Sequence, residues 1–144
     1  MNQSDTRLKQ SAILKVGLGA MLAAVLANLL ARFILGLLFP LSPDFQPFSY
    51  GAIVFFTVGF TLIGVIVLWV VFRLFANPLK VYNILAVVAF FFSLIPNFLG
   101  AANPSAMPMG GNSRDYLILI LFHIVAAAAF LGVLNALSRP RGGQ

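Results

Sequence analysis

The sequence contains no cysteine and few charged residues. Only 8% of its 144 residues are charged, and three acidic residues stand against nine Lys and Arg. Soluble domains carry about a quarter charged residues, so this composition excludes an ordinary soluble domain. The missing cysteine excludes disulfides and cysteine-based metal sites. Apolar residues are in excess: 61% of the residues are hydrophobic, and the mean hydropathy is +1.02.

Side chains that carry chemistry are also scarce. No Asp or Glu lies within the long apolar stretches, which excludes a carboxylate proton relay across them. The sequence has no nucleophile–base motif, glycine-rich phosphate loop or metal-ligand motif. The single histidine, His123, has no second histidine or carboxylate at ligand spacing, so we predict neither a metal site nor a cofactor. These absences predict that the protein is not an enzyme.

Four long apolar stretches organise the chain. A helix needs about 20 residues to cross the hydrocarbon of a bilayer, and each stretch is about that long or longer. We therefore predict an all-α fold, a four-transmembrane-helix bundle in antiparallel up-down order. The membrane domain covers 13–138, with spans at about 13–39, 51–73, 81–99 and 116–137, between an N-terminal segment 1–12 and a tail 139–144.

Local signals mark where the spans begin and end. Asn77 and Pro78 predict a short turn, because Asn suits a helix C-terminus and Pro suits the first turn of the next helix. Ser113 is the expected N-cap of the fourth span, with Asp115 near the positive end of its dipole. The first span is too long for the apolar part of a secretion signal, so we expect it to be retained.

Basic residues gather on one side of the predicted membrane. Seven of them lie in or beside the N-terminal segment, the turn at 76–80 and the tail, namely Arg7, Lys9, Lys15, Arg73, Lys80, Arg139 and Arg141. The other two loops hold only Arg114. Because cytoplasmic loops carry an excess of Lys and Arg, we predict that both termini are cytoplasmic. Orientation and anionic lipid headgroups explain the positive charge, so we predict no nucleic-acid partner.

Five polar residues share a similar depth in the outer half of the predicted bundle, on three different spans. They are Asn28, Arg32, Ser93, Asn97 and His123. Because Cα–Cβ bonds tilt toward a helix's N-terminus, the Arg32 side chain should lean toward the membrane centre. A charged Arg there costs at least about 2.5–3.5 kcal/mol unless it is satisfied. Its expected acceptors are Asn97, His123, the Phe92 carbonyl that Pro96 leaves without a helical donor, and the nearby Asp44 or Asp115.

Two interpretations of these five residues stay open. The first is a structural network that stabilises the bundle by about 0.6–2 kcal/mol per hydrogen bond. The second is a small polar pocket, open to the outside, that binds an anionic or polar ligand. We favour the structural network because the polar groups are few. The inner half offers no comparable set, since Asn135 stands alone there.

Small residues recur at helical spacing on two spans, which allows neighbouring helices to approach closely. The first row is Gly19, Ala23, Ala27 and Ala31, and the second is Ala128, Gly132 and Ala136. We expect these rows to pack within the bundle. The alternative is an interface between copies of the chain.

Several short motifs resemble those of one bacterial family. They are AAVLANLLAR in the first span, SLIPN in the third, a Gly/Pro-rich outer loop, and LFHIVAAAA in the fourth. Over most of residues 12–138 the chain resembles an uncharacterised family of small four-helix integral membrane proteins, a domain of unknown function. The resemblance implies the four-span fold and draws attention to Asn28, Pro96 and His123. It implies no activity.

Three functional hypotheses follow. In the first, the chain is a non-enzymatic structural or accessory protein, multi-pass in the bacterial inner (cytoplasmic) membrane. Its partners there are the lipid bilayer and either a second copy or other membrane proteins. In the second, it is a small-ligand binder or transport component that uses Asn28, Arg32, Asn97 and His123. The third, an enzyme acting on a lipid-borne anion through His123 and Arg32, has the least support.

Overall fold

The computed structural model describes the backbone of residues 3–138 and the side chains from residue 12 to residue 138. Four long helices make up most of it: α1 (Gln3–Leu38), α2 (Tyr50–Leu74), α3 (Pro78–Ala102) and α4 (Ser113–Ser138). Two short 3₁₀ helices, η1 (Gln46–Phe48) and η2 (Pro104–Ala106), lie in the long loops. No strand occurs among these residues, which confirms the all-α class.

Each of the four helices is long and apolar enough to cross a membrane. Within the most apolar window of each helix, only 17–28% of the residues are buried inside the protein. The remaining apolar faces point outward, where water would be unfavourable and lipid is favourable. The chain is therefore a multi-pass membrane protein.

The ends of α3 and α4 differ slightly from the predictions. Pro96 lies inside α3, as it does in the predicted span at about 81–99, and the helix continues to Ala102. Proline is tolerated in membrane helices because neighbouring groups and local adjustments satisfy the freed backbone. The N-cap of α4 is Asn112 rather than Ser113, which is already helical. Asn112 Oδ1 accepts from the backbone N–H groups of Arg114 and Asp115 at 2.9 and 3.3 Å. In return, Asp115 Oδ2 accepts from the backbone N–H of Asn112 at 2.9 Å, which makes a reciprocal capping box.

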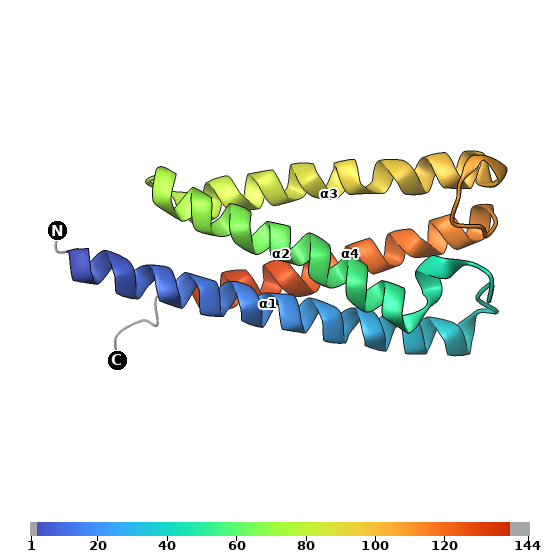
Figure 1. Cartoon of the computed structure of the whole chain (residues 1–144), viewed down its shortest axis with the longest axis horizontal. Helices are drawn as coiled ribbons and strands as arrows, with labels where there is room; N and C mark the ends of the chain where they lie inside the picture. Colours follow the sequence, from blue (N-terminus) through green and yellow to red (C-terminus); the bar gives the residue numbers. More distant parts are fainter. Residues whose placement is uncertain (1–2, 139–144) are drawn as a thin grey trace.

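The helices pack around a shared core. α1 packs most extensively against α4 and α2, α3 packs against α4, and the contact between α2 and α3 is the smallest of the four. Figure 1 shows the loops 39–49 and 103–112 together at one end of the molecule, which we call the loop end. The turn 75–77 and the start of α1 lie at the opposite end, which we call the turn end.

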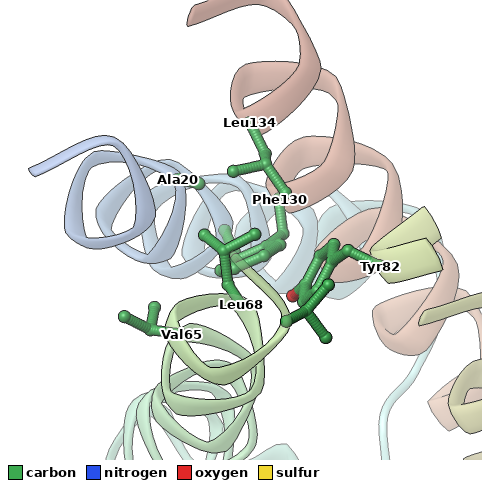
Figure 2. Packing of buried hydrophobic residues seen from close by; sticks show 8 residues of the cluster. Ala20, Val65, Leu68, Tyr82, Phe130 and Leu134 are labelled. Carbon is green, nitrogen blue, oxygen red and sulfur yellow. The ribbon is translucent and has the colours of Figure 1, made fainter. Parts of the chain in front are cut away.

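The core near the turn end contains side chains from all four helices (Figure 2). Its buried members are Ala20, Ala24, Val65, Leu68, Val71, Tyr82, Phe130 and Leu134. Ala20 and Ala24 have no exposed surface, so α1 presents small residues where its neighbours approach most closely.

The two predicted rows of small residues pack differently: Ala31 of the α1 row packs against the buried residues near the loops, whereas the α4 row is exposed. On α1 the fully buried residues are Ala20 and Ala24, one position along from the predicted row, in which Gly19 is exposed and the others are half-buried. On α4 the row Ala128, Gly132 and Ala136 is exposed, and a Cβ added at Gly132 would meet nothing within 4 Å. A shift of one residue rotates a side chain by about 100° around a helix. The predicted internal packing is therefore wrong for the α4 row.

Candidate functional site

Arg32 reaches toward the loop end and not toward the membrane centre. Its Nε donates to the Phe48 carbonyl at 2.7 Å, and its Cζ lies 5.2 Å from the centre of the Tyr50 ring. A Cβ added at Gly36, one turn further along α1, would lie 2.5 Å from Nη1. The predicted inward lean is thus wrong, because the missing side chain at Gly36 leaves room for the guanidinium to run outward along the helix.

The acceptors expected for Arg32 were also wrong. Within residues 3–138, the one hydrogen bond found for its guanidinium goes to the Phe48 carbonyl and none goes to α3 or α4. The physical reason is the order of the helices, since Arg32 lies on the side of α1 that meets η1 and the start of α2. Sequence patterns missed Phe48 because a loop carbonyl leaves no side-chain signal.

Asn28 connects α1 to α2 one turn deeper. Its Nδ2 donates to Thr57 Oγ1 at 3.0 Å, and both residues are buried. Asn28 Oδ1 has no hydrogen-bond partner among the described residues. Sequence patterns do not reveal Thr57 as a partner, because a helical Thr ordinarily bonds its own backbone, as Thr61 does with the Thr57 carbonyl at 2.6 Å. The hydrogen bond between Asn28 and Thr57 is a structural link between α1 and α2.

The other three predicted site residues bond their own helices. Ser93 Oγ donates to the Phe90 carbonyl at 2.7 Å, and Asn97 Nδ2 donates to the Ser93 carbonyl at 3.2 Å. His123 Nδ1 donates to the Leu119 carbonyl at 3.0 Å, which places the proton of a neutral ring on Nδ1. Within the described residues, no hydrogen bond joins these three side chains to Asn28 or Arg32. The five residues do not form one hydrogen-bonded set.

Asn135 is not alone near the turn end. Its Nδ2 donates to Asn83 Oδ1 at 3.2 Å, and Asn83 Nδ2 donates back to Asn135 Oδ1 at 3.0 Å. Asn135 Nδ2 also donates to the Leu131 carbonyl at 2.8 Å. This reciprocal amide pair connects α3 to α4 and was missed from the sequence. The available signal was two amides at equal depth on consecutive antiparallel spans.

Buried aromatic and aliphatic side chains close the loop end, and we call them the loop-end plug. The plug consists of Phe45, Phe48, Ile53, Tyr116, Ile118 and Phe122. Phe45 packs edge-on against both Phe48 and Tyr116, with ring centroids 4.8 Å apart in each pair. The Tyr116 hydroxyl donates to the Gly110 carbonyl at 3.0 Å, which ties the second loop to the plug.

Glycines make room for this plug. The Tyr116 ring lies so close to Gly100 that a Cβ there would overlap its ring atoms. Gly110 and Gly111 have φ angles of +72° and +81°, in the left-handed region that favours glycine. A Cβ at Gly111 would also overlap the Phe45 ring. The two loops are further joined by a hydrogen bond of 3.3 Å from Asn112 Nδ2 to Ser42 Oγ.

Two shallow surface hollows on the described part of the chain are lined by none of the five predicted site residues. One follows α2 from Tyr50 to Gly59, and the other lies between the first loop and Met109. Among the described side chains, 12–138, no group of three or more His, Cys, Asp or Glu could bind a metal ion. The chemistry that this arrangement supports is structural hydrogen bonding, together with one guanidinium whose terminal nitrogens are free of described acceptors.

Comparisons with known proteins give one match. No curated protein and no solved structure matches the chain. A model of a family of unknown function (DUF6069) matches residues 4–140. That range covers nearly the whole chain, and it agrees with the resemblance to an uncharacterised family that the motifs suggested. The chain belongs to this family of unknown function, DUF6069.

Proposed function

We propose that this membrane protein is a non-enzymatic structural or accessory component of the bacterial inner membrane. Its four helices cross the bilayer in up-down order, with both termini in the cytoplasm. The distribution of Lys and Arg supports this orientation, with Arg73 and Lys80 at the turn end and Arg114 at the loop end. Its partners are the surrounding lipid and either a second copy or another membrane protein.

The single observation that carries this proposal is the burial of Asn28 and Asn97, two of the five predicted site residues. Asn97 is 3% exposed, and its amide already donates to the Ser93 carbonyl. A pocket that binds a water-borne ligand needs an opening and polar groups that are still free to bind. The loop-end plug is buried at the same end of the molecule, and among the described residues Asn97 has no exposed opening beside it large enough to raise its exposure above 3%.

Cysteine reactivity tests this burial. The chain has no cysteine, so a single Asn97→Cys thiol is the only one in the variant. We expect this thiol to react with a small hydrophilic methanethiosulfonate reagent at least about a hundredfold more slowly than a Ser105→Cys thiol, because the thiolate that reacts is disfavoured in a buried apolar site. The reaction is followed by mass spectrometry on the purified protein in lipid nanodiscs.

Ser105→Cys is the matched control because Ser105 is exposed in η2 at the same end of the molecule. Labelling after denaturation shows that the buried thiol is intact, and thermal unfolding shows that the variant is folded. Equal reaction rates for the two thiols in the folded protein would contradict the burial of Asn97 and favour the ligand-binding or transport hypothesis.

A further inference from the structure

We propose that Arg32 and a groove on α2 bind a glycerophospholipid in the leaflet at the loop end. In this site the guanidinium holds the phosphate, and the groove holds one acyl chain. The proposal goes beyond the structural role, and it does not depend on which side of the membrane the loop end faces.

The guanidinium has donors to spare and a charge that its described contacts do not neutralise. Its Nε is used by the Phe48 carbonyl, while no acceptor for Nη1 or Nη2 is found among the side chains of 12–138 and the described backbone. Those two nitrogens carry four N–H groups in a planar fork that matches phosphate oxygens. The described contacts are a carbonyl and the Tyr50 ring, and neither carries a negative charge. An anion is the ligand that complements this half-buried group.

An apolar groove begins at the residue over which Arg32 stacks. It is lined by Tyr50, Gly51, Val54, Phe55, Val58 and Gly59. A Cβ added at Gly51 or Gly59 would meet nothing within 4 Å, so the two glycines keep the groove open. At 1.5 Å per residue the lining runs about 14 Å along α2, close to half of the roughly 30 Å hydrocarbon thickness. The groove therefore matches the acyl layer of one leaflet.

The depth of the guanidinium matches the level of lipid phosphates. Lys15 is exposed near the start of the apolar part of α1, and we take it as the other boundary of the hydrocarbon because Lys favours the membrane surface. A hydrocarbon layer of about 30 Å corresponds to about 20 helical residues, which places the second boundary near residue 35. The Arg32 guanidinium lies beside Gly36, at that boundary. Arg32 thus reaches outward to the polar edge of the leaflet, as membrane Arg side chains do.

Native mass spectrometry of the delipidated full chain tests the site. Three probes are titrated: phosphatidylglycerol, diacylglycerol with the same chains, and inorganic phosphate. We expect phosphatidylglycerol to bind saturably. The other two should bind at least about tenfold more weakly, because diacylglycerol lacks the phosphate that the guanidinium would hold and inorganic phosphate lacks the acyl chain that the groove would hold. Inorganic phosphate binding as tightly as the lipid would indicate a free-anion site, and diacylglycerol binding as tightly would indicate an apolar groove alone. Either result would overturn the proposal.

Variants separate the site from general electrostatics. We expect Arg32→Gln to weaken phosphatidylglycerol binding by about tenfold or more, because charge-assisted hydrogen bonds are lost. Arg114→Gln removes the same charge from an exposed position at the loop end and should change affinity by less than about twofold. A Cβ at Gly59 would meet nothing within 4 Å, so we expect Gly59→Leu to fill the groove, weaken lipid binding about tenfold and leave thermal unfolding unchanged.

The outcomes are decisive in each case. Weaker binding in Gly59→Leu, together with a larger loss in Arg32→Gln than in Arg114→Gln, supports the site. If Arg32→Gln does not fold, Gly59→Leu decides alone. Equal losses in the two arginine variants, or unchanged binding in Gly59→Leu, would overturn the proposal.

Discussion

Replacing Gly100 with leucine should lower the free energy of unfolding by about 3 kcal/mol, at the upper end of the range for overpacked sites. A Cβ at this position already overlaps the ring of Tyr116. That ring cannot move aside, because it is 2% exposed, packs against Phe45, and is tied to the Gly110 carbonyl through its hydroxyl. The measurement is equilibrium unfolding of the purified protein in mixed micelles.

Gly132→Leu is the matched control for this substitution. Gly132 is also helical, but a Cβ there would meet nothing within 4 Å. We expect its effect on unfolding to stay within about 0.5 kcal/mol of the unsubstituted protein, as for exposed sites generally. Comparable losses at Gly100 and Gly132 would show that the Tyr116 ring does not pack against Gly100 as described.

Truncating Phe45 to alanine should cost about 3–5 kcal/mol, as deletion of a buried aromatic ring does. Phe45 is 1% exposed and contacts two other rings of the loop-end plug edge-on. Phe45 lies in a loop, so its ring would be exposed to water if it were not buried, and the hydrophobic effect therefore favours its burial. Packing between helices inside lipid lacks that driving force.

Phe60→Ala provides the comparison for Phe45→Ala. The Phe60 side chain lies on α2 and is 65% exposed to the surroundings. Because lipid tails are as apolar as the ring that they contact, its removal should cost less than about 1 kcal/mol. Equilibrium unfolding of both variants gives the difference, and a Phe45→Ala loss no larger than that of Phe60→Ala would mean that the plug does not stabilise the loop end.

Hydropathy predicted the four helices because length and apolar composition alone decide whether a segment can cross a bilayer. The predicted third span, at about 81–99, also ran through Pro96, and α3 ends at Ala102. Proline would end or kink a helix in water, whereas a membrane helix tolerates it.

The sequence predicted less accurately which face of each helix packs against its neighbours. A helix that is apolar all round has a weak periodic signal, so its rotation is set by the partners against which it packs. Ala20 and Ala24 are buried where Gly19 and Ala23 were expected, a shift of one residue. For the same reason, Ala128 and Gly132 lie on the exposed side of α4.

The partners of the polar residues could not be predicted from the sequence. Asn28 donates to Thr57, and Arg32 donates to the Phe48 carbonyl. A helical Thr ordinarily bonds its own backbone, so Thr57 gave no sign of a partner on another helix, and a backbone carbonyl leaves no mark in the sequence.

Thiol labelling from outside intact bacterial spheroplasts is the most direct test of a four-span protein with its loop end outward. Ser105 in the second loop and Asn77 in the α2–α3 turn are both exposed, and the chain has no cysteine of its own. With a membrane-impermeant maleimide, Ser105→Cys should react before permeabilisation, and Asn77→Cys should react only after it. Labelling of Asn77→Cys in intact spheroplasts would contradict this topology, whether or not Ser105→Cys also reacted.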